Sequence, residues 1–426
     1  MVVALVVDQL AAWEAIERWP SLPPSGGFAK LLEESQRSAI LRYPYAHNAT
    51  AMGHASLFTG AVPHDSGIVA NGKLVKPGEF VSFFADEPTR VVTGHGPVDR
   101  PSSSLRSLLV PAFADALREA RPDALVIALS MKDRGALFGG GRKPDAGLWV
   151  DAKEDAFVTS TAFAERTPAW ADAFTVKGAG ARYRPKPWTP PDPTWLAARG
   201  IPSGDLGQGD FHHLGAAFPH DLEKADPAPK AFVATPFADS MLLDLATRAA
   251  DEAAKANRPT LLTVSLSATD YVGHVFGPDA PEAWDQMLRL DTRLAAFLDH
   301  LDATFGEDGY AIVLSSDHGV PPTPEVMKAR FCDQSTPDPF QRRCTSPVRL
   351  FESQLAKVAQ AAAERAAGKG DWVLGGNEPY VELTAAARAL EPKKRRALVD
   401  AVARALDDLP GVLRVYAAEG LPDVCP

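Results

Sequence analysis

Three short apolar runs in this chain each lead into acidic or imidazole side chains, and this pattern constrains the fold more than any other feature. The runs are Val2–Val7, Leu261–Ser265 and Ala311–Leu314. Continuous aliphatic and β-branched runs of this length are typical of strands buried in a parallel sheet. Amphipathic stretches with helical spacing, such as Ala238–Ala254 and Ala280–Leu301, alternate with the runs. This alternation predicts an α/β fold, a doubly wound and mainly parallel sheet flanked by helices.

The residues that follow the three runs indicate a metal site. Ligands in open α/β sheets bind beyond the carboxyl ends of the strands. Carboxylate and imidazole groups without thiolates suit zinc or a similar divalent ion. An Asp that ends a strand often caps a turn, so each residue alone is weak evidence, and it is their joint occurrence that favours a metal site. The candidate ligands are Asp8, Asp270, His274, Asp317 and His318.

Thr50 is the candidate nucleophile. It stands just before a short helical run, and the free N–H groups at a helix N-terminus favour an anion. A bound metal ion would favour the alkoxide of this hydroxyl by electrostatics. A plain N-cap is the commoner role of Thr at such a position and remains the alternative. We interpret His54 and His64 as structural or surface residues rather than metal ligands.

Two cationic side chains and one amide are candidates for binding phosphoryl oxygens. Lys132 and Arg134 follow a further apolar run, and their spacing lets both side chains point the same way. Arg can donate two parallel hydrogen bonds to such oxygens, whereas Lys acts as a point charge. A solvated turn is the usual meaning of this pattern. Asn71 could donate its amide to the same oxygens or could belong to an Asn-Gly turn.

Charge and composition exclude several classes of protein. The net charge of -10 argues against general affinity for nucleic acid or for an anionic membrane. No stretch of the sequence is long and apolar enough to span a bilayer. The chain starts inside a run typical of a strand, without the basic region and apolar core of a signal peptide. We therefore expect that a leader was removed or that the sequence was cut.

The length of 426 residues favours one large α/β domain over residues 1–426. The stretch from about 135 to 230 breaks the alternation and is rich in Pro and aromatic residues, which we interpret as a cap inserted over the edge of the sheet. Cys332 and Cys344 could close a small disulfide ring, as in proteins of an oxidising compartment, but two free thiols are equally compatible with the pattern. Cys425 is left without an evident partner.

Taken together, these segments resemble the alkaline phosphatase superfamily, and most of all its bacterial phosphomonoesterases of the phosphate-irrepressible type, which use a Thr nucleophile. The matching segments run from Val2 to about Gly319. The resemblance implies hydrolysis of small-molecule phosphate monoesters through a phosphothreonine intermediate on Thr50. It also implies a periplasmic or secreted enzyme that is a monomer or a weak homodimer and does not bind nucleic acid or membranes.

The resemblance further implies a role for each candidate residue. Asn71, Lys132 and Arg134 fall where the family keeps its phosphoryl-binding residues. The metal site would hold two zinc ions. The first ion would be bound by Asp8, Asp317 and His318, and the Thr50 oxygen would contact it. The second ion would be bound by Asp270 and His274 together with one further His.

Two positions depart from the family pattern. Ser66 precedes Gly67 and Ile68 where the family usually has a His, and we expect little consequence. The last zinc ligand of the family normally comes from a Thr-x-His-Gly segment near the C-terminus, yet no His follows His318 in this sequence. We interpret this as a C-terminal truncation, natural or artefactual, that leaves the second zinc site incomplete.

Three alternatives to a phosphomonoesterase remain. The first is a phosphodiesterase or nucleotide pyrophosphatase of the same superfamily, whose substrate carries less charge and a second organic group. The second, a sulfatase, is disfavoured because the Cys or Ser motif that becomes formylglycine is absent around Thr50. The third is a folded metal-binding remnant with little activity, because the second site would lack a ligand.

Overall fold

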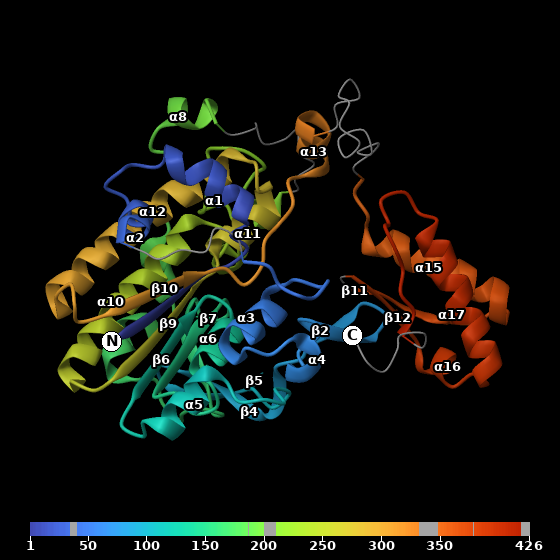
Figure 1. The fold of residues 1–426 in the computed structure, drawn as a ribbon, viewed down its shortest axis with the longest axis horizontal. Helices are drawn as coiled ribbons and strands as arrows, with labels where there is room; N and C mark the ends of the chain where they lie inside the picture. Colours follow the sequence, from blue (N-terminus) through green and yellow to red (C-terminus); the bar gives the residue numbers. More distant parts are fainter. Residues whose placement is uncertain (35–40, 186, 200–209, 332–347, 378, 419–426) are drawn as a thin grey trace. The chain divides into compact units, whose positions relative to one another are not determined.

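The computed structural model describes residues 1–34, 41–185, 187–199, 210–331, 348–377 and 379–418. The chain divides into two compact units (Figure 1). Unit 1 comprises Met1–Asn71 and Phe84–Thr323, and unit 2 comprises Gly72–Phe83 and Pro324–Pro426. The single domain over residues 1–426, with an inserted cap, stays a prediction from the sequence.

Unit 1 is built on an eight-stranded sheet with the strand order β10-β1-β9-β6-β7-β8-β4-β5. The strands from β10 to β7 run parallel, and β8, β4 and β5 complete the sheet with antiparallel pairs. The predicted doubly wound, mainly parallel fold is therefore confirmed. The strands are β1 (Val2–Val7), β4 (Ala85–Thr93), β5 (Gly96–Ser103), β6 (Leu125–Ser130), β7 (Ala146–Asp151), β8 (Ala156–Ser160), β9 (Thr260–Leu266) and β10 (Ala311–Ser315).

The register of the parallel strands aligns their carboxyl ends. Val6 of β1 is paired with Ser315 of β10 and with Ser265 of β9. Ser265 is in turn paired with Ser130 of β6. Because these pairs lie at the same level of the sheet, the segments that follow the four strands leave it at a common edge.

Helices cover both faces of this sheet (Figure 1). On one face, Val3, Leu5 and Val7 pack in a core shared with α10 (Pro236–Ala256) and α12 (Pro281–Phe305). On the other face, Val6 packs with α3 (Thr50–Thr59) and α6 (Asp133–Gly140), and α5 (Phe113–Ala120) packs on β6 and β9. Because successive side chains of a strand point to opposite faces of the sheet, one continuous apolar run fills two cores. Shorter helices are α1 (Ala12–Arg18), α2 (Gly27–Glu34), α4 (Pro63–Ser66) and α11 (Ala268–Phe276).

The range predicted as an inserted cap contains two different kinds of structure. Strands β7 and β8 lie inside it and extend the central sheet. The remainder forms short helices, and Trp188 within it is completely buried and donates from Nε1 to Asp285 Oδ2 of α12 at 2.7 Å. The aromatic residues of this stretch thus pack on the body of unit 1. Its short helices are α7 (Asp172–Thr175), α8 (Pro193–Ala197) and α9 (Ala228–Phe232), with 3-10 turns at Ala169–Ala171, Ala179–Tyr183 and Phe211–His213.

Unit 2 combines two hairpins with helices. Its core lies between α15 and α17, where Ala359, Ala363 and Leu398 are completely buried. Asn377 Nδ2 donates to the carbonyl oxygen of Gly72 at 3.0 Å, which ties the first hairpin to the second. The elements are β2 (Gly72–Lys76), β3 (Glu79–Ser82), α13 (Pro324–Phe331), α15 (Glu352–Ala367), β11 (Val373–Asn377), β12 (Tyr380–Leu383), α16 (Ala385–Arg388) and α17 (Pro392–Asp407).

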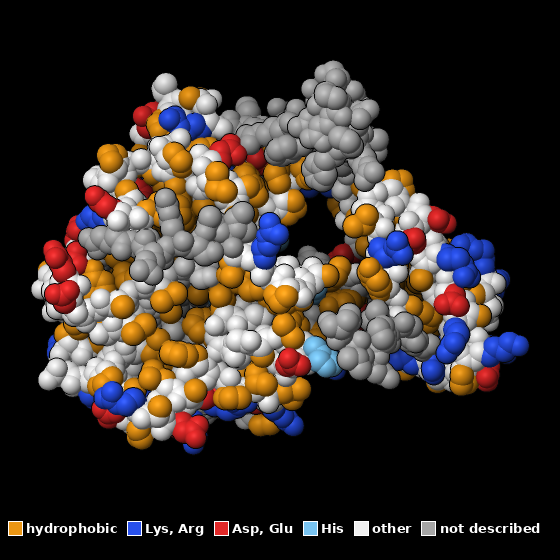
Figure 2. All heavy atoms as spheres, viewed as in Figure 1, with side chains coloured by type: hydrophobic (Ala, Val, Ile, Leu, Met, Phe, Trp, Pro, Cys, Tyr) orange, Lys and Arg blue, Asp and Glu red, His pale blue; other side chains and the backbone are white. Residues whose placement is uncertain are grey.

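Charged side chains of both signs are scattered over unit 1 on the face shown in Figure 2. Among the described residues, no helix has the length and apolar character needed to cross a bilayer. Cys332, Cys344 and Cys425 lie outside the described residues. A disulfide between Cys332 and Cys344 therefore stays one of two possibilities drawn from the sequence.

Candidate functional site

Four neighbouring parallel strands deliver the candidate residues to one edge of the sheet. Asp8 directly follows β1, and Asp270 lies in the first turn of α11 after β9. Asp317 follows β10, and Lys132 follows β6 as the N-cap of α6. The backbone N–H of Asp8 donates to the carbonyl oxygen of Leu266 at 2.9 Å, which fixes the ends of β1 and β9 at the same level. The predicted convergence of distant acidic residues is therefore present in the structure.

The acidic and imidazole groups form one buried cluster. Ligand atoms of Asp8, Asp270 and His318 all lie within 4.8 Å of one another, and no other group with this property occurs among the residues described. His318 Nε2 lies 3.3 Å from Asp8 Oδ1 and 3.7 Å from both Asp270 Oδ1 and Asp317 Oδ2. His274 Nε2 lies 3.2 Å from Asp270 Oδ1, although its side chain is largely exposed. The structure thus brings together all five candidate ligands, with Asp317 and His274 beside the group of three.

The donor atoms of this cluster fit a metal cation. Both carboxylate oxygens of Asp8, Oδ2 of Asp317 and Nε2 of His318 are buried and lack a hydrogen bond of normal geometry within the described part of the chain. Buried polar atoms without such partners are costly, and a cation would take up their lone pairs. The donors are carboxylate oxygens and an imidazole nitrogen, the set that zinc and related divalent ions use.

In the metal-free structure the charges within the cluster shift the pKa values of Asp8 and His318 in opposite directions. Burial acts to raise the pKa of Asp8, but Lys132 and His318 together hold it well below its usual range. Burial acts to lower the pKa of His318, but the carboxylates of Asp317, Asp8 and Asp270 raise it to about 9. Three carboxylates, of Asp8, Asp270 and Asp317, thus lie around His318, and carboxylates grouped in this way favour a bound cation.

Lys132 lies among the carboxylates. Its Nζ donates to Asp270 Oδ2 at 2.5 Å and lies 2.7 Å from Asp8 Oδ2. The same Nζ donates to Thr50 Oγ1 at 3.1 Å. The sequence predicted this side chain only as a contact for phosphoryl oxygens. The structure places its ammonium group between two acidic side chains and next to the candidate nucleophile.

Thr50 is the first residue of α3. The N-cap residue of this helix is Ala49, whose side chain makes no capping hydrogen bond. Asn71 takes over this role, because its Oδ1 accepts the N–H of Ala51 at 3.1 Å. Because the N–H of Ala51 needs an acceptor, the side-chain atom that faces it is Oδ1 of Asn71. The amide nitrogen Nδ2 then points the other way and remains available as a donor. A hydroxyl and an amide donor therefore lie together at the N-terminus of α3, where an anion is stabilised.

Arg134 lies one residue beyond the N1 position of α6, two residues after Lys132. Its Nη1 is 3.6 Å from Asp133 Oδ1. Burial acts to lower the pKa of Arg134, but Asp133 and the acidic groups of the site raise it. The guanidinium group thus stays charged at the rim of the cluster.

Gln9 is a residue of the site that the sequence did not reveal. Its Nε2 donates to Asp270 Oδ1 at 2.9 Å and lies 3.2 Å from His274 Nε2, and its backbone N–H donates to Asp317 Oδ1 at 3.1 Å. It adopts a φ of 67°, which is uncommon for a residue other than Gly. A Cβ atom on Gly273 would lie 2.4 Å from Gln9 Oε1, so the helix leaves room for this amide. The one feature of the sequence that could have indicated a role for Gln9 in the site is its position directly after Asp8.

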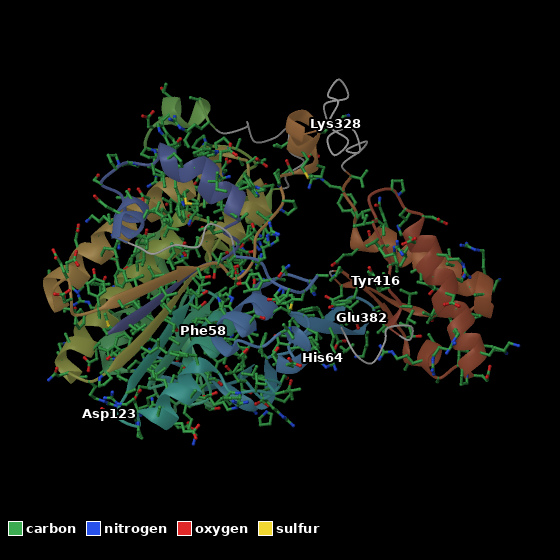
Figure 3. The ribbon with its side chains drawn as sticks, in the orientation of Figure 1. Phe58, His64, Asp123, Lys328, Glu382 and Tyr416 are labelled. Atoms are coloured by element: carbon green, nitrogen blue, oxygen red, sulfur yellow. The ribbon has the colours of Figure 1, made fainter. Side chains whose placement is uncertain are left out.

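The remaining residues considered from the sequence lie outside the cluster or behind it. His64 is exposed on α4 (Figure 3). Ser66, at the position where the family usually has a His, is buried, and its Oγ accepts the N–H of Ile68 at 3.3 Å. His54 is completely buried on α3, behind the candidate nucleophile.

Asp239 of α10 is a buried acid that holds the start of α11. Its Oδ1 accepts the N–H of Ala268 at 3.2 Å, and its Oδ2 accepts Nε2 of Gln286 at 3.0 Å. Burial raises the pKa of Asp239 to about 7. Because α11 carries Asp270 and His274, this contact helps to place both candidate ligands.

We expect Asp239→Asn to make the stability of the metal-free protein less dependent on pH. A carboxyl whose pKa is higher in the folded than in the unfolded state stabilises the fold below the unfolded value of about 3.9, and this contribution is lost as the pH rises through the folded value. The amide stays neutral, so the fall in Tm between about pH 5 and about pH 8 should be smaller in the variant. Thermal unfolding followed by circular dichroism measures this, and an equal fall in both proteins would contradict it.

Comparisons with known proteins identify relatives over most of the chain. The family described as type I phosphodiesterase / nucleotide pyrophosphatase matches residues 2–424. The chain is 33% identical over 345 residues to alkaline phosphatase PafA of Elizabethkingia meningoseptica, with 77% of this chain and 61% of that protein covered. It is 31% identical over 333 residues to alkaline phosphatase PhoV of Synechococcus elongatus, with 77% and 60% covered.

A protein named calcium-transporting ATPase from Myroides odoratus is similar to the same degree, 32% identical over 343 residues, with 78% of this chain and 61% of that protein covered. The chain thus spans about three fifths of the length of these curated relatives. The crystal structure of PafA matches this fold with a TM-score of 0.81 at 27% identity, covering 99% of this chain and 80% of that one. A variant of PafA in which a Thr, an Asn, a Lys and an Arg are replaced matches with a TM-score of 0.82.

Proposed function

Because the chain belongs to the type I phosphodiesterase / nucleotide pyrophosphatase family, within the alkaline phosphatase superfamily, we propose that it hydrolyses small phosphate monoesters in a metal-dependent reaction. One observation carries the proposal. The Thr50 hydroxyl lies 3.1 Å from an ammonium group that itself sits between two buried carboxylates at the carboxyl edge of the sheet. A candidate nucleophile, a cationic side chain and a candidate metal-binding cluster thus lie close to one another.

The metal ions would be zinc. Asp8, Asp317 and His318 would hold one ion, and Asp270 and His274 would hold a second together with a further donor. When bound, such ions supply positive charge that stabilises the transferring phosphoryl group and favours the ionised form of a nearby hydroxyl. Asp8 and Asp317 follow adjacent strands, which supports their assignment to the same ion.

The side chains of this protein divide the reaction between them. Thr50 Oγ forms a bond to phosphorus as the bond to the leaving alcohol oxygen breaks, and water later breaks the resulting phosphothreonine ester, so that the products are the alcohol and phosphate. Lys132, Arg134 and the Asn71 amide bind the phosphoryl oxygens. Fixed charges and donors of this kind supply most of the catalysis in phosphoryl transfer. The free N–H groups at the start of α3 add to them.

The PafA variant supports the assignment of these four residues. Its replaced residues are a Thr, an Asn, a Lys and an Arg, in that order along the chain, with the Lys and the Arg two positions apart. Thr50, Asn71, Lys132 and Arg134 have the same types, the same order and the same final spacing. PafA and PhoV are named alkaline phosphatases, which favours small phosphate esters as substrates. From the resemblance seen in the sequence we further propose a periplasmic or secreted enzyme that is a monomer or weak homodimer and does not act on nucleic acid or a membrane surface.

Hydrolysis of phosphodiesters or of nucleotide pyrophosphates is the second candidate, and the description of the family favours it. We expect the double substitution of Lys132→Ala with Arg134→Ala to separate the two. A monoester carries up to two negative charges and a diester one, so the loss of two cations should lower kcat/KM for a monoester at least about 10-fold more than for a diester. Steady-state rates with 4-nitrophenyl phosphate and bis(4-nitrophenyl) phosphate measure the difference, and equal losses would count against a monoesterase.

Metal content separates an active enzyme from a metal-binding remnant. Asp270 and His274 are two donors, and no His follows His318 in this sequence. We expect the active protein to bind two zinc ions per chain, to lose hydrolysis in the presence of a chelator and to regain it on addition of zinc. Elemental analysis after dialysis gives the stoichiometry. One ion per chain without turnover would support the remnant instead.

A further inference from the structure

His54 is a buried imidazole that the proposed reaction does not use. It lies on α3 one helical turn after Thr50, and its side chain is completely inaccessible to solvent. The elements packed around it are the helix of the candidate nucleophile, strand β9 and the segment after β10. A polar ring enclosed among such elements requires partners, and the structure provides three.

The contacts of the ring define its tautomer. Nδ1 lies 3.0 Å from the carbonyl oxygen of Thr50 and 2.9 Å from Asp317 Oδ2. Nε2 lies 2.7 Å from Ser265 Oγ. A carbonyl oxygen and a carboxylate oxygen only accept hydrogen bonds, so the hydrogen belongs on Nδ1, and Nε2 is free to accept the hydroxyl of Ser265.

Gly53 gives independent evidence that α3 is built to contact Asp317. A Cβ atom at this position would lie 2.0 Å from the carbonyl oxygen of Asp317 and 2.8 Å from its Cβ. Any side chain there would push the helix away from Asp317. The helix therefore approaches the ligand segment through a Gly and contacts its carboxylate through the next residue, His54.

We infer that His54 is a positioning residue that fixes the rotation of the Asp317 carboxylate and couples it to the nucleophile helix. Oδ1 of Asp317 is held by the N–H groups of Gln9 at 3.1 Å and His318 at 2.9 Å. His54 is the contact at Oδ2, the oxygen that also faces His318 Nε2 at 3.7 Å. His54 Nδ1, which is hydrogen-bonded to the carbonyl oxygen of Thr50 at 3.0 Å, thus lies against Oδ2 at 2.9 Å without the geometry of a hydrogen bond, and the ring limits how the Asp317 carboxylate can turn.

Two amide substitutions distinguish the contacts of the ring. The amide nitrogen of Asn at this position lies close to where Nδ1 lies, whereas that of Gln reaches toward Nε2. We expect His54→Gln to weaken zinc binding and to lower kcat by about 10- to 100-fold with little change in KM, as for other residues that orient metal ligands. His54→Asn should keep both within about 3-fold of the wild-type protein. Ser265→Ala is the matched control, because it removes only the partner of Nε2 and should change zinc affinity less than about 3-fold.

Zinc affinity is measured by competition with a chromophoric chelator, and Tm is measured on the metal-free proteins. Equal losses of zinc affinity for His54→Asn and His54→Gln, or a lower Tm with unchanged zinc affinity, would reduce His54 to a packing residue. The inference rests on the proposed function only for kcat. If the protein hydrolyses no phosphate ester, the proposed function fails, whereas the zinc comparison still decides the role of His54.

A measurement on the unsubstituted protein keeps the inference testable if His54→Gln does not fold. Long-range proton–nitrogen NMR spectra of the protein labelled with ¹⁵N-histidine report which ring nitrogen carries the hydrogen. The expected result is a hydrogen on Nδ1, with the resonance of His54 identified by its absence in His54→Asn. A neutral ring with its hydrogen on Nε2 would overturn the inference, since Nδ1 would then turn a lone pair toward the Asp317 carboxylate at 2.9 Å.

Discussion

Replacement of Thr50 by Ala is expected to abolish the hydrolysis of phosphate monoesters, with kcat/KM lower by roughly 10³-fold or more. The substitution removes the hydroxyl at the N-terminus of α3, whose oxygen lies 3.1 Å from Nζ of Lys132. Without this oxygen no covalent phosphoryl intermediate can form. Steady-state rates with 4-nitrophenyl phosphate measure the loss.

Folding of the Thr50→Ala protein should be preserved, because Ala fits a helical position and Asn71 continues to accept the N–H of Ala51. Its circular dichroism spectrum and zinc content should equal those of the wild-type protein. Thr50→Ser is the matched control, since it keeps a hydroxyl and should retain measurable turnover. Full activity in Thr50→Ala would remove Thr50 from its proposed role.

The substitution Asp8→Asn is expected to have the second large effect, on metal binding. Asp8 lies at the centre of the cluster, with its carboxylate 2.7 Å from Lys132 Nζ and 3.3 Å from His318 Nε2. The amide keeps the shape of the side chain but removes its charge, and a neutral amide is a far weaker zinc ligand than a carboxylate. Zinc affinity should fall by more than about 100-fold, beyond the range found for residues that only orient ligands.

Competition with a chelator measures this affinity, and the loss of turnover should follow it. Asp123→Asn is a suitable control, because Asp123 is exposed in the turn before β6 (Figure 3) and its carboxylate pairs with nearby Arg121, away from the cluster. The control should bind zinc as the wild-type protein does. Equal zinc affinity in Asp8→Asn and Asp123→Asn would show that the cluster is not the metal site.

The cluster of candidate metal ligands could be predicted because its residues follow strands. A parallel sheet brings its carboxyl ends to one edge whatever the details of packing, so Asp8, Asp270 and Asp317 converge once the strands are recognised. The place of Lys132 could not be predicted in the same way. Its ammonium group lies between two carboxylates, and that direction depends on how α6 packs against the strands.

The supporting residues depend on tertiary contacts that leave little trace in the sequence. His54 resembles any His on a short helix until the helix is seen to contact Asp317. Gln9 acts through a φ of 67°, which the sequence does not signal for a Gln. The division into two units rests on bonds between distant segments, such as that of Asn377 with Gly72, and such pairs are not visible in a local pattern.

Anomalous X-ray diffraction at the zinc edge, from crystals of the protein prepared with zinc, would locate the metal ions. We expect zinc bound to Asp8, Asp317 and His318 with the Thr50 hydroxyl beside it, and a second zinc at Asp270 and His274. Zinc peaks only at other residues, with Asp8 and His318 still free of metal, would contradict it.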